Sequence, residues 1–404
     1  MLYVGIDWGR KNHQVALVNS SGRLLESFAA PHSGQGFQLI RERIEHYQQD
    51  PNSVRVAIEL HDGPLCSWLP DQGYQVLGVN PKSAAQARTL LRPSGCKDDV
   101  FDAYTLATVA ALPAFPLQPL PPSDDTLLAL QTLLDLREDL VEQKTTLLKQ
   151  IRTLLDEWAP ALSALCKDLN SRWQRQLLHR WPLERDLADA HPNAVASFDK
   201  KHRLRVATRE LIRGARSQMP LPIGADHADA LRRKMAHLLT RLDSLCGELQ
   251  DLEAEIDQRS AEDENAALVD SLPAVGIVSR AAWTVALRCA RVHGLDWEAL
   301  AARCGVAPLT RQSGGSRSVH RRRGHDRTLR RLLTYYAFIT TNCEGCWAHD
   351  DYQRRRARGA SHYTALRAIA RRWLKIACAL VRHHDPYSEQ LRRQAQSNDL
   401  KQAA

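Results

Sequence analysis

The chain has 404 residues, of which 44% are hydrophobic and 25% charged, a composition that excludes a disordered or fibrous protein and indicates a globular one. Its length exceeds what one ordinary core supports, so we expect two or three domains. It has no apolar run of membrane-spanning length and no signal-peptide-like start, which predicts a cytoplasmic, nucleoid-associated protein.

The positive charge is concentrated near the C-terminus. Between Arg311 and Arg393 there are 19 lysines and arginines against 6 acids, an excess of 13, whereas the whole chain carries +9 and the remainder therefore −4. This predicts a polyanionic partner, with a solvated arginine-rich helix face as the alternative. The clusters 321–323 and 354–356 favour the polyanion, because closely packed like charges repel unless phosphates neutralise them.

The first 110 residues predict an α/β domain. Residues 2–7, 13–19 and 23–29 form a three-stranded meander, and residues 54–60 and 74–80 have the composition of two buried strands. Residues 35–48 and 98–112 have helical spacing, and the second helix begins with acids that suit its dipole. Residues 113–123 contain five prolines, which predicts a stiff linker and a domain boundary.

Two long helices are expected next. Leucines recur every seventh residue over 127–158, and residues 231–256 carry a heptad seam of nearly four repeats. The helices could pair within one chain or with a second chain, and long seams favour an oligomer. Residues 264–404 predict a basic, mainly helical unit.

Four acids stand at the ends of elements in the α/β domain. Asp7 ends the first strand, Glu59 ends the fourth, and Asp99 and Asp102 share one face at the start of a helix. If the first and fourth strands are neighbours, these carboxylates converge. Clustered carboxylates repel unless cations lie between them, and oxygen-only ligands suit Mg²⁺ or Mn²⁺. Two such ions can clamp the oxygens of phosphodiester transfer. Solvated strand ends are the alternative reading.

The chain resembles the DEDD-type transposases of bacterial insertion sequences, a group that includes the pilin-gene invertases and the bridge-RNA-guided recombinases. Four segments carry the resemblance: Gly5-Ile6-Asp7, Glu59 after an apolar strand, 97–103 (KDDVFDA), and Gly305-Val306-Ala307-Pro308 followed by Gln312-Ser313-Gly314. Asp98 departs from the family pattern, so either Asp98 or Asp99 is the third carboxylate, and the spacing to Asp102 favours Asp99.

The resemblance implies an N-terminal RNase H-like (RuvC-type) domain over residues 1–115, a linker and helical coiled-coil region over 116–260, and a helical transposase domain over 261–404. It also implies that Ser313 attacks the scissile phosphate and forms a phosphoserine, assisted by metal ions at the four carboxylates. Expected partners are DNA (element ends and target), a structured non-coding guide RNA, and further copies of the chain in a dimer or tetramer. The arginines expected to hold phosphates are Arg311, Arg317, Arg321, Arg322, Arg323 and Arg327.

Other functions stay open on sequence alone. A RuvC-like nuclease of branched DNA would use the same acids with water as nucleophile, and a non-catalytic nucleic-acid-binding protein would use the basic region only. A sugar-kinase-like ATPase would need a second phosphate loop, which is absent from the sequence. Of the nine cysteines, Cys343 and Cys346 have the spacing of a metal pair without a second such pair, which favours a structural role.

Overall fold

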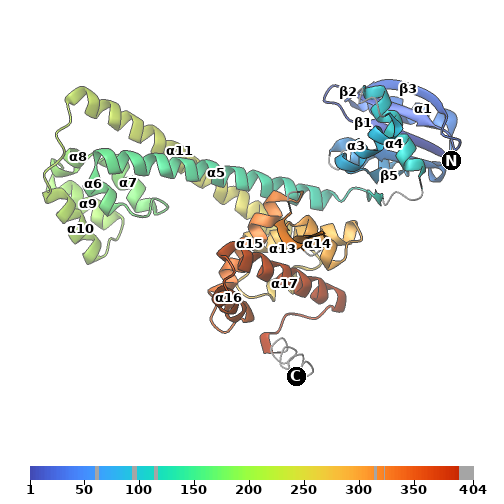
Figure 1. Cartoon of the computed structure of the whole chain (residues 1–404). Helices are drawn as coiled ribbons and strands as arrows, with labels where there is room; N and C mark the ends of the chain where they lie inside the picture. The colour runs from blue at the N-terminus through green and yellow to red at the C-terminus, as the bar shows by residue number, and fades with distance from the viewer. Residues whose placement is uncertain (60–62, 93–97, 113–116, 314–315, 323, 391–404) are drawn as a thin grey trace. The chain divides into compact units, whose positions relative to one another are not determined.

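The computed structural model describes residues 1–59, 63–92, 98–112, 117–313, 316–322 and 324–390. Of Gln118, Arg311, Ser313, Ser316, Arg317, Val319 and Arg321 it describes the backbone only. The chain divides into two compact units, Met1–Ala129 with Trp283–Ala404, and Leu130–Ala282 (Figure 1). Among the described residues, no helix is long and apolar enough to cross a membrane.

The N-terminal part of the first unit is built on one mixed sheet. Its strands lie in the order β3-β2-β1-β4-β5-β6. β1 pairs antiparallel with β2 and β2 with β3, whereas β4 pairs parallel with both β1 and β5. This sheet confirms the α/β prediction and is consistent with a RuvC-like domain. The strands are β1 (Leu2–Asp7), β2 (Asn12–Val18), β3 (Leu24–Pro31), β4 (Val54–Ile58), β5 (Gln75–Gly78) and β6 (Gln118–Pro119).

The sixth strand comes from the segment expected to be linker. β6 pairs antiparallel with β5 at the sheet edge, and the Leu120 amide donates to the Val76 carbonyl over 2.7 Å. Proline is tolerated there because an edge strand leaves one side of its backbone unpaired. Residues 118–120 of the expected linker therefore belong to the sheet edge.

Helices cover both faces of the sheet. α1 (Gly34–Tyr47) and α2 (Pro64–Asp71) bury their apolar side chains against Val4, Ile6 and Val56, with the short 3-10 helix η1 (Pro51–Ser53) between α1 and β4. α3 (Pro81–Leu91) and α4 (Asp99–Ala111) pack on the opposite face, around Ala57 and Leu77. Alternate residues of a strand face opposite sides, so each strand contributes to both cores.

Gly5 lets β1 and α4 approach backbone to backbone. A Cβ atom at Gly5 would lie 1.9 Å from the Ala103 carbonyl oxygen and 2.4 Å from the Ala107 nitrogen. Both are main-chain atoms of α4, so no side-chain rotation relieves the overlap. The glycine thus fixes the helix that carries Asp99 and Asp102 on the strand that carries Asp7.

We expect Gly5→Ala to destabilise this domain by about 3 kcal/mol or more, because overpacking against backbone forces the strand and helix apart. Thermal unfolding measured by circular dichroism checks this. Gly34→Ala is the matched control, since a Cβ there meets nothing within 4 Å. Equal melting temperatures for the two variants would contradict the close approach.

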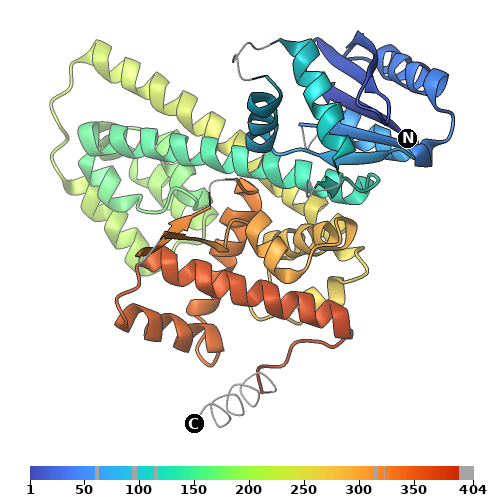
Figure 2. The same cartoon turned by 45° about the vertical axis from the view of Figure 1, so that its right-hand side comes forward.

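The second unit is dominated by two long antiparallel helices. α5 (Asp125–Trp158) and α11 (Ala225–Ala261) contact each other near both ends: Arg137 pairs with Glu253 at 2.8 Å, and the rings of Trp158 and His227 lie 4.5 Å apart. Figures 1 and 2 both show the helices side by side. The seam of α11 is buried at every predicted position, namely Leu231, Met235, Leu238, Leu242, Leu245, Leu249, Leu252 and Ile256. Of the two pairings left open, the one within a single chain is present.

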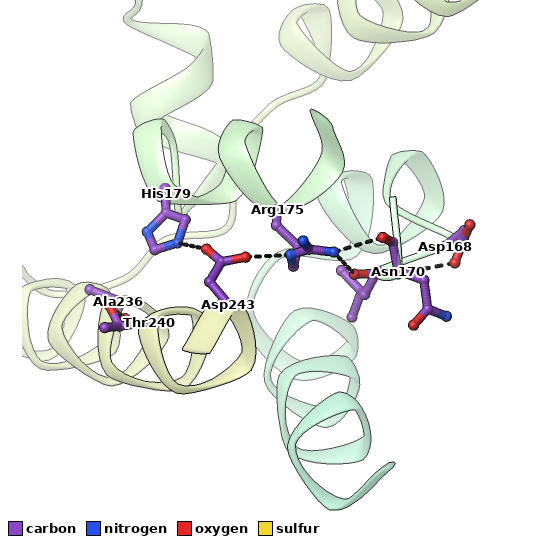
Figure 3. A network of polar contacts seen from close by, with 8 residues as sticks. Asp168, Asn170, Arg175, His179, Ala236, Thr240 and Asp243 are labelled. Carbon is purple, nitrogen blue, oxygen red and sulfur yellow. Dashed lines mark hydrogen bonds and ion pairs between the residues drawn. The ribbon is translucent and has the colours of Figure 1, made fainter. Parts of the chain in front are cut away.

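Five short helices lie at the end of this pair that contains Trp158 and His227. They are α6 (Pro160–Leu165), α7 (Arg172–Arg180), α8 (Glu184–Ala188), α9 (Pro192–Lys201) and α10 (Val206–Ser217). A polar network attaches α7 to α11 (Figure 3): Asp243 accepts from Arg175 at 2.5 Å and contacts His179 at 2.9 Å. Arg175 is buried and also donates to the carbonyl of Asn170. Because a buried guanidinium needs several partners, this network fixes the cap on the long helices.

The C-terminal part of the first unit is helical around an aromatic core. Trp283, Tyr336, Trp347 and Trp373 are buried, and neighbouring rings in this group lie 4.9–5.7 Å apart. The prediction of a mainly helical unit missed one feature, a hairpin of strands β7 (Pro308–Ser313) and β8 (Ser316–Arg321). A short helix, α12 (Ala266–Asp270), precedes this part. The helices that follow are α13 (Ile277–Val292), α14 (Trp297–Arg303), α15 (Arg327–Thr341), α16 (Trp347–Ala357) and α17 (His362–His383).

Candidate active site

Two of the predicted carboxylates lie at one edge of the sheet. β1 and β4 are parallel neighbours, with Gly5 opposite Ala57 and Ile6 opposite Ile58. Asp7 is the last residue of β1, and Glu59 follows β4 directly. Gly5 and Ala57 both face α4, and a strand returns to the same face every second residue. The register therefore directs Asp7 and Glu59 toward the α4 side.

The other two carboxylates lie in the first turn of α4. Asp102 is buried, and the guanidinium of Arg88, on α3, forms a short ion pair with it. Asp99 is exposed one turn earlier. A buried carboxylate needs a charge partner, and Arg88 supplies it here. The sequence prediction missed Arg88, although its spacing of four residues from Arg92 indicated a basic helix face just before the acids.

Asp98 has a structural task that Asp99 lacks. It is the N-cap of α4, accepting from the Phe101 amide at 2.7 Å, and it pairs with Arg92 at 2.7 Å. The hydrogen bond from Phe101 and the one from Arg92 lower the pKa of the Asp98 carboxyl below its usual value. Because Asp98 is committed to capping and pairing, Asp99 is the better candidate for a metal ligand.

Carboxylate oxygens are suitable ligands for a hard cation such as Mg²⁺, but the described side chains at this edge do not form a complete metal site. Within the described ranges, which omit residues 60–62 and 93–97, no three His, Cys, Asp or Glu side chains are close enough to hold a metal ion together. Asp7 has an interaction partner of its own, and Arg88 pairs with Asp102.

Ser313 lies at the tip of a hairpin rather than in an irregular loop. It ends β7 opposite Ser316, which leaves two residues, Gly314 and Gly315, for the turn; their structure lies outside the described residues. A Gly-Gly pair between two strands is a typical hairpin signal, and the sequence prediction overlooked it. On β8, the Ser318 hydroxyl lies 2.9 Å from Nε2 of His320.

Gly305, in the segment that leads into this hairpin, is required by packing. Gly305 adopts a left-handed φ of +66°, and a Cβ there would lie 2.1 Å from the His325 ring. The Asp326 amide donates to the Arg303 carbonyl over 2.9 Å. Contacts between residues 303–305 and 325–326 therefore join the two ends of the hairpin at its base.

The predicted phosphate-binding arginines surround this hairpin in sequence. Arg311, Arg317 and Arg321 belong to its strands, although only their backbones are described. Arg327 is exposed in the first turn of α15, and Arg322 is half-buried. Arg323 lies outside the described residues.

The cluster 354–356 is partly engaged within the chain. Asp351 is buried and pairs with Arg354, Arg355 and Arg372, at 3.4, 2.9 and 3.0 Å. Burial alone would raise the pKa of Asp351, but Arg355 and Arg372 hold it below its usual value. One carboxylate offsets only one of these three positive charges, and Arg354 stays exposed, so a contact of this cluster with phosphates stays a prediction.

Within the part of the chain that the structure describes, Cys343 and Cys346 form no disulfide bond, and Cys346 is buried at the N-cap of α16. Burial raises the pKa of the Cys166 thiol to about 12 and that of Cys378 to about 11, which leaves both protonated and unreactive at neutral pH.

Comparison with known proteins matches both ends of the chain. A family model described as a transposase matches residues 4–160, and a model described as the IS116/IS110/IS902 transposase family matches residues 266–353. A mini-circle protein assigned as the transposase of IS117 from Streptomyces coelicolor is 29% identical over 395 residues, 95% of each chain. A 42 kDa protein of insertion element IS900 from Mycobacterium paratuberculosis is 28% identical over 397 residues, 96% of this chain and 97% of that one.

Proposed function

We propose that the chain is a DEDD transposase of the IS110 family, which the two matching family models and the similar transposases support, and that it cuts and rejoins DNA with a divalent-metal carboxylate site and a serine nucleophile. The carboxylates are Asp7, Glu59, Asp99 and Asp102, and the nucleophile is Ser313. One observation carries the proposal: Asp7 and Glu59 end neighbouring parallel strands on the face where Gly5 clamps the helix of Asp99 and Asp102.

The metal ion would be Mg²⁺ or Mn²⁺, since every proposed ligand is a carboxylate oxygen. When bound, such an ion supplies positive charge that stabilises the oxygens of the phosphoryl group during transfer. For Asp102 to serve as a ligand it has to exchange its ion pair with Arg88 for the cation. Arg88 then becomes available to a DNA phosphate, which arginine binds in bidentate geometry.

Ser313 would act at the scissile phosphate. Its hydroxyl oxygen forms a bond to phosphorus and loses its proton, the bond to the leaving DNA oxygen breaks, and that oxygen takes up a proton. A DNA hydroxyl reverses the step and releases the serine when strands are rejoined. The hairpin supports this role because its tip bears the serine beside two glycines, where a phosphate can approach the backbone closely.

The proposed partners follow from the same chemistry. The arginine-rich hairpin region suits the DNA of the element ends and of the target, and a structured guide RNA offers the same phosphate backbone. We propose that two or four copies act together, because two DNA ends are cut and joined in one reaction.

An excision assay on a plasmid-borne element tests the carboxylate site. We expect Asp99→Asn to abolish excision, lowering it roughly 10³-fold, because it removes a charge from the ligand set. Asp98→Asn should excise normally, since asparagine caps a helix as well as aspartate does. The assay is run with EDTA, Mg²⁺ and Mn²⁺, and full excision by Asp99→Asn in Mg²⁺ would disprove the assignment.

A further inference from the structure

A basic surface lies on the helical cap of the second unit, outside both matched family segments, which end at residue 160 and resume at residue 266. It is formed by the end of α9, the turn 202–205 and the start of α10. Over residues 198–216 there are seven lysines and arginines against two acids, an excess of five. The surface is defined by Lys200, Lys201, Arg203, Arg205, Arg209 and Arg213, all of them exposed.

Four of these cations have no ion-pair partner among the described residues: Lys200, Lys201, Arg203 and Arg205. Elsewhere in the same unit arginines are paired, as Arg175 is with Asp243 and Arg232 with Asp186. Arginines elsewhere in the unit thus have acid partners, whereas these four cations have none among the described residues. Adjacent unpaired cations repel one another unless an external anion is bound.

Two arginines stand where the backbone favours other residues. Arg203 follows the end of α9 with a left-handed φ of +49°, a position that glycine normally occupies because it has no Cβ. Arg205 is the N-cap of α10 and makes no side-chain capping bond, whereas Ser, Thr, Asp or Asn would cap that helix. Both positions thus carry a positive charge where another residue would stabilise the local backbone more.

The positive charge of this surface affects the pKa values of two neighbouring groups, His202 and Asp199. His202 has its pKa lowered by burial first and then by Lys201 and Arg172. Burial raises the pKa of Asp199, and Arg209 and Arg213 offset only part of that rise. Together with Glu210 it gives the segment two acids against seven lysines and arginines, so the surface stays positive.

We propose that this α9–α10 surface binds the phosphate backbone of a nucleic acid, as a second contact remote in sequence from the serine hairpin. The inference rests on the proposed function, which requires the chain to hold DNA and a structured RNA. Its cations are lysines and arginines without exposed aromatic neighbours in the turn 202–205, a composition that contacts phosphates rather than stacking bases. Both nucleic acids share this chemistry.

The test is binding of the full-length chain to a fluorescent 30-base-pair DNA duplex and, separately, to an RNA hairpin, by anisotropy over a range of salt concentrations. The variant combines Lys200→Gln, Lys201→Gln, Arg203→Gly and Arg205→Ser. The last two changes introduce residues that the backbone favours, so thermal unfolding should be unchanged or improved. The control removes the same charge from exposed positions on α5 and α11: Lys149→Gln, Arg233→Gln, Lys234→Gln and Arg241→Gln.

We expect the α9–α10 variant to bind at least one of the two ligands about tenfold to a hundredfold more weakly near 150 mM salt, with the slope of log affinity against log salt reduced by about 3. Loss confined to the duplex identifies DNA as the occupant, and loss confined to the hairpin identifies RNA. Affinities and slopes equal to those of the control for both ligands would overturn the proposal. Binding does not require catalysis, so the Asp99→Asn protein, which is expected not to excise DNA, should give the same binding result. A failure of the proposed catalytic site is therefore distinguished from a failure of the proposed binding surface.

Discussion

Ser313→Ala is expected to eliminate the covalent protein–DNA intermediate, lowering its yield and that of recombined DNA roughly 10³-fold or more, because no other hydroxyl replaces a lost nucleophile in its own position. The intermediate is measured by incubating protein with labelled DNA ends, denaturing the mixture and resolving protein-linked label on a gel. Noncovalent DNA binding should be unchanged, since alanine removes only the hydroxyl oxygen.

Ser318→Ala is the matched control on the same hairpin. Ser318 contacts His320, the arrangement of an activated serine, so it is the alternative nucleophile that the structure itself offers. We expect its adduct yield to stay within about twofold of the unmodified chain. An adduct that survives Ser313→Ala and disappears in Ser318→Ala would reassign the nucleophile. DNA cleavage without any adduct in the unmodified chain would instead favour the nuclease with water as attacking group.

Asp7→Asn is expected to abolish strand cleavage, by roughly 10²–10³-fold, without loss of DNA binding. The substitution keeps the size of the side chain at the end of β1 but removes the negative charge that a divalent cation needs. Cleavage is measured on labelled DNA ends at several Mn²⁺ and Mg²⁺ concentrations, together with DNA affinity by anisotropy.

The matched control is Glu42→Gln, an exposed acid on α1, on the sheet face opposite α4. It makes the same acid-to-amide change and should cleave normally. If Asp7→Asn retains full cleavage at all metal concentrations, Asp7 is a solvated strand end and the carboxylate site is abandoned. If both variants lose cleavage together with DNA binding, the defect is in folding rather than in metal binding, because removing an acid does not weaken the attraction to DNA phosphates.

The sheet was predictable because its strands are short apolar runs separated by turn residues. The meander, the two buried strands and the acid-initiated helix all appear near the predicted residues, and the pairing of β1 with β4 was the condition for bringing Asp7 and Glu59 together. The tight Gly5 contact was not predictable, since it depends on which helix returns over the strand.

Charge counting does not reveal which arginines already contact an acid. Arg354 and Arg355 on α16 and Arg372 on α17 share the single carboxylate of Asp351. The hairpin 308–321 escaped because its strands are polar and lack an apolar face. The partner of each long helix was likewise undetermined, because a heptad seam specifies a neighbour without saying which one.

The second unit, Leu130–Ala282, is an insertion in sequence between the two segments of the first unit, Met1–Ala129 and Trp283–Ala404. Within it α5 and α11 run antiparallel and contact each other through Arg137 and Glu253. Removing or adding seven residues in each helix at facing positions would preserve the heptad seam. Engineering can therefore change the length of this helix pair while keeping its internal packing.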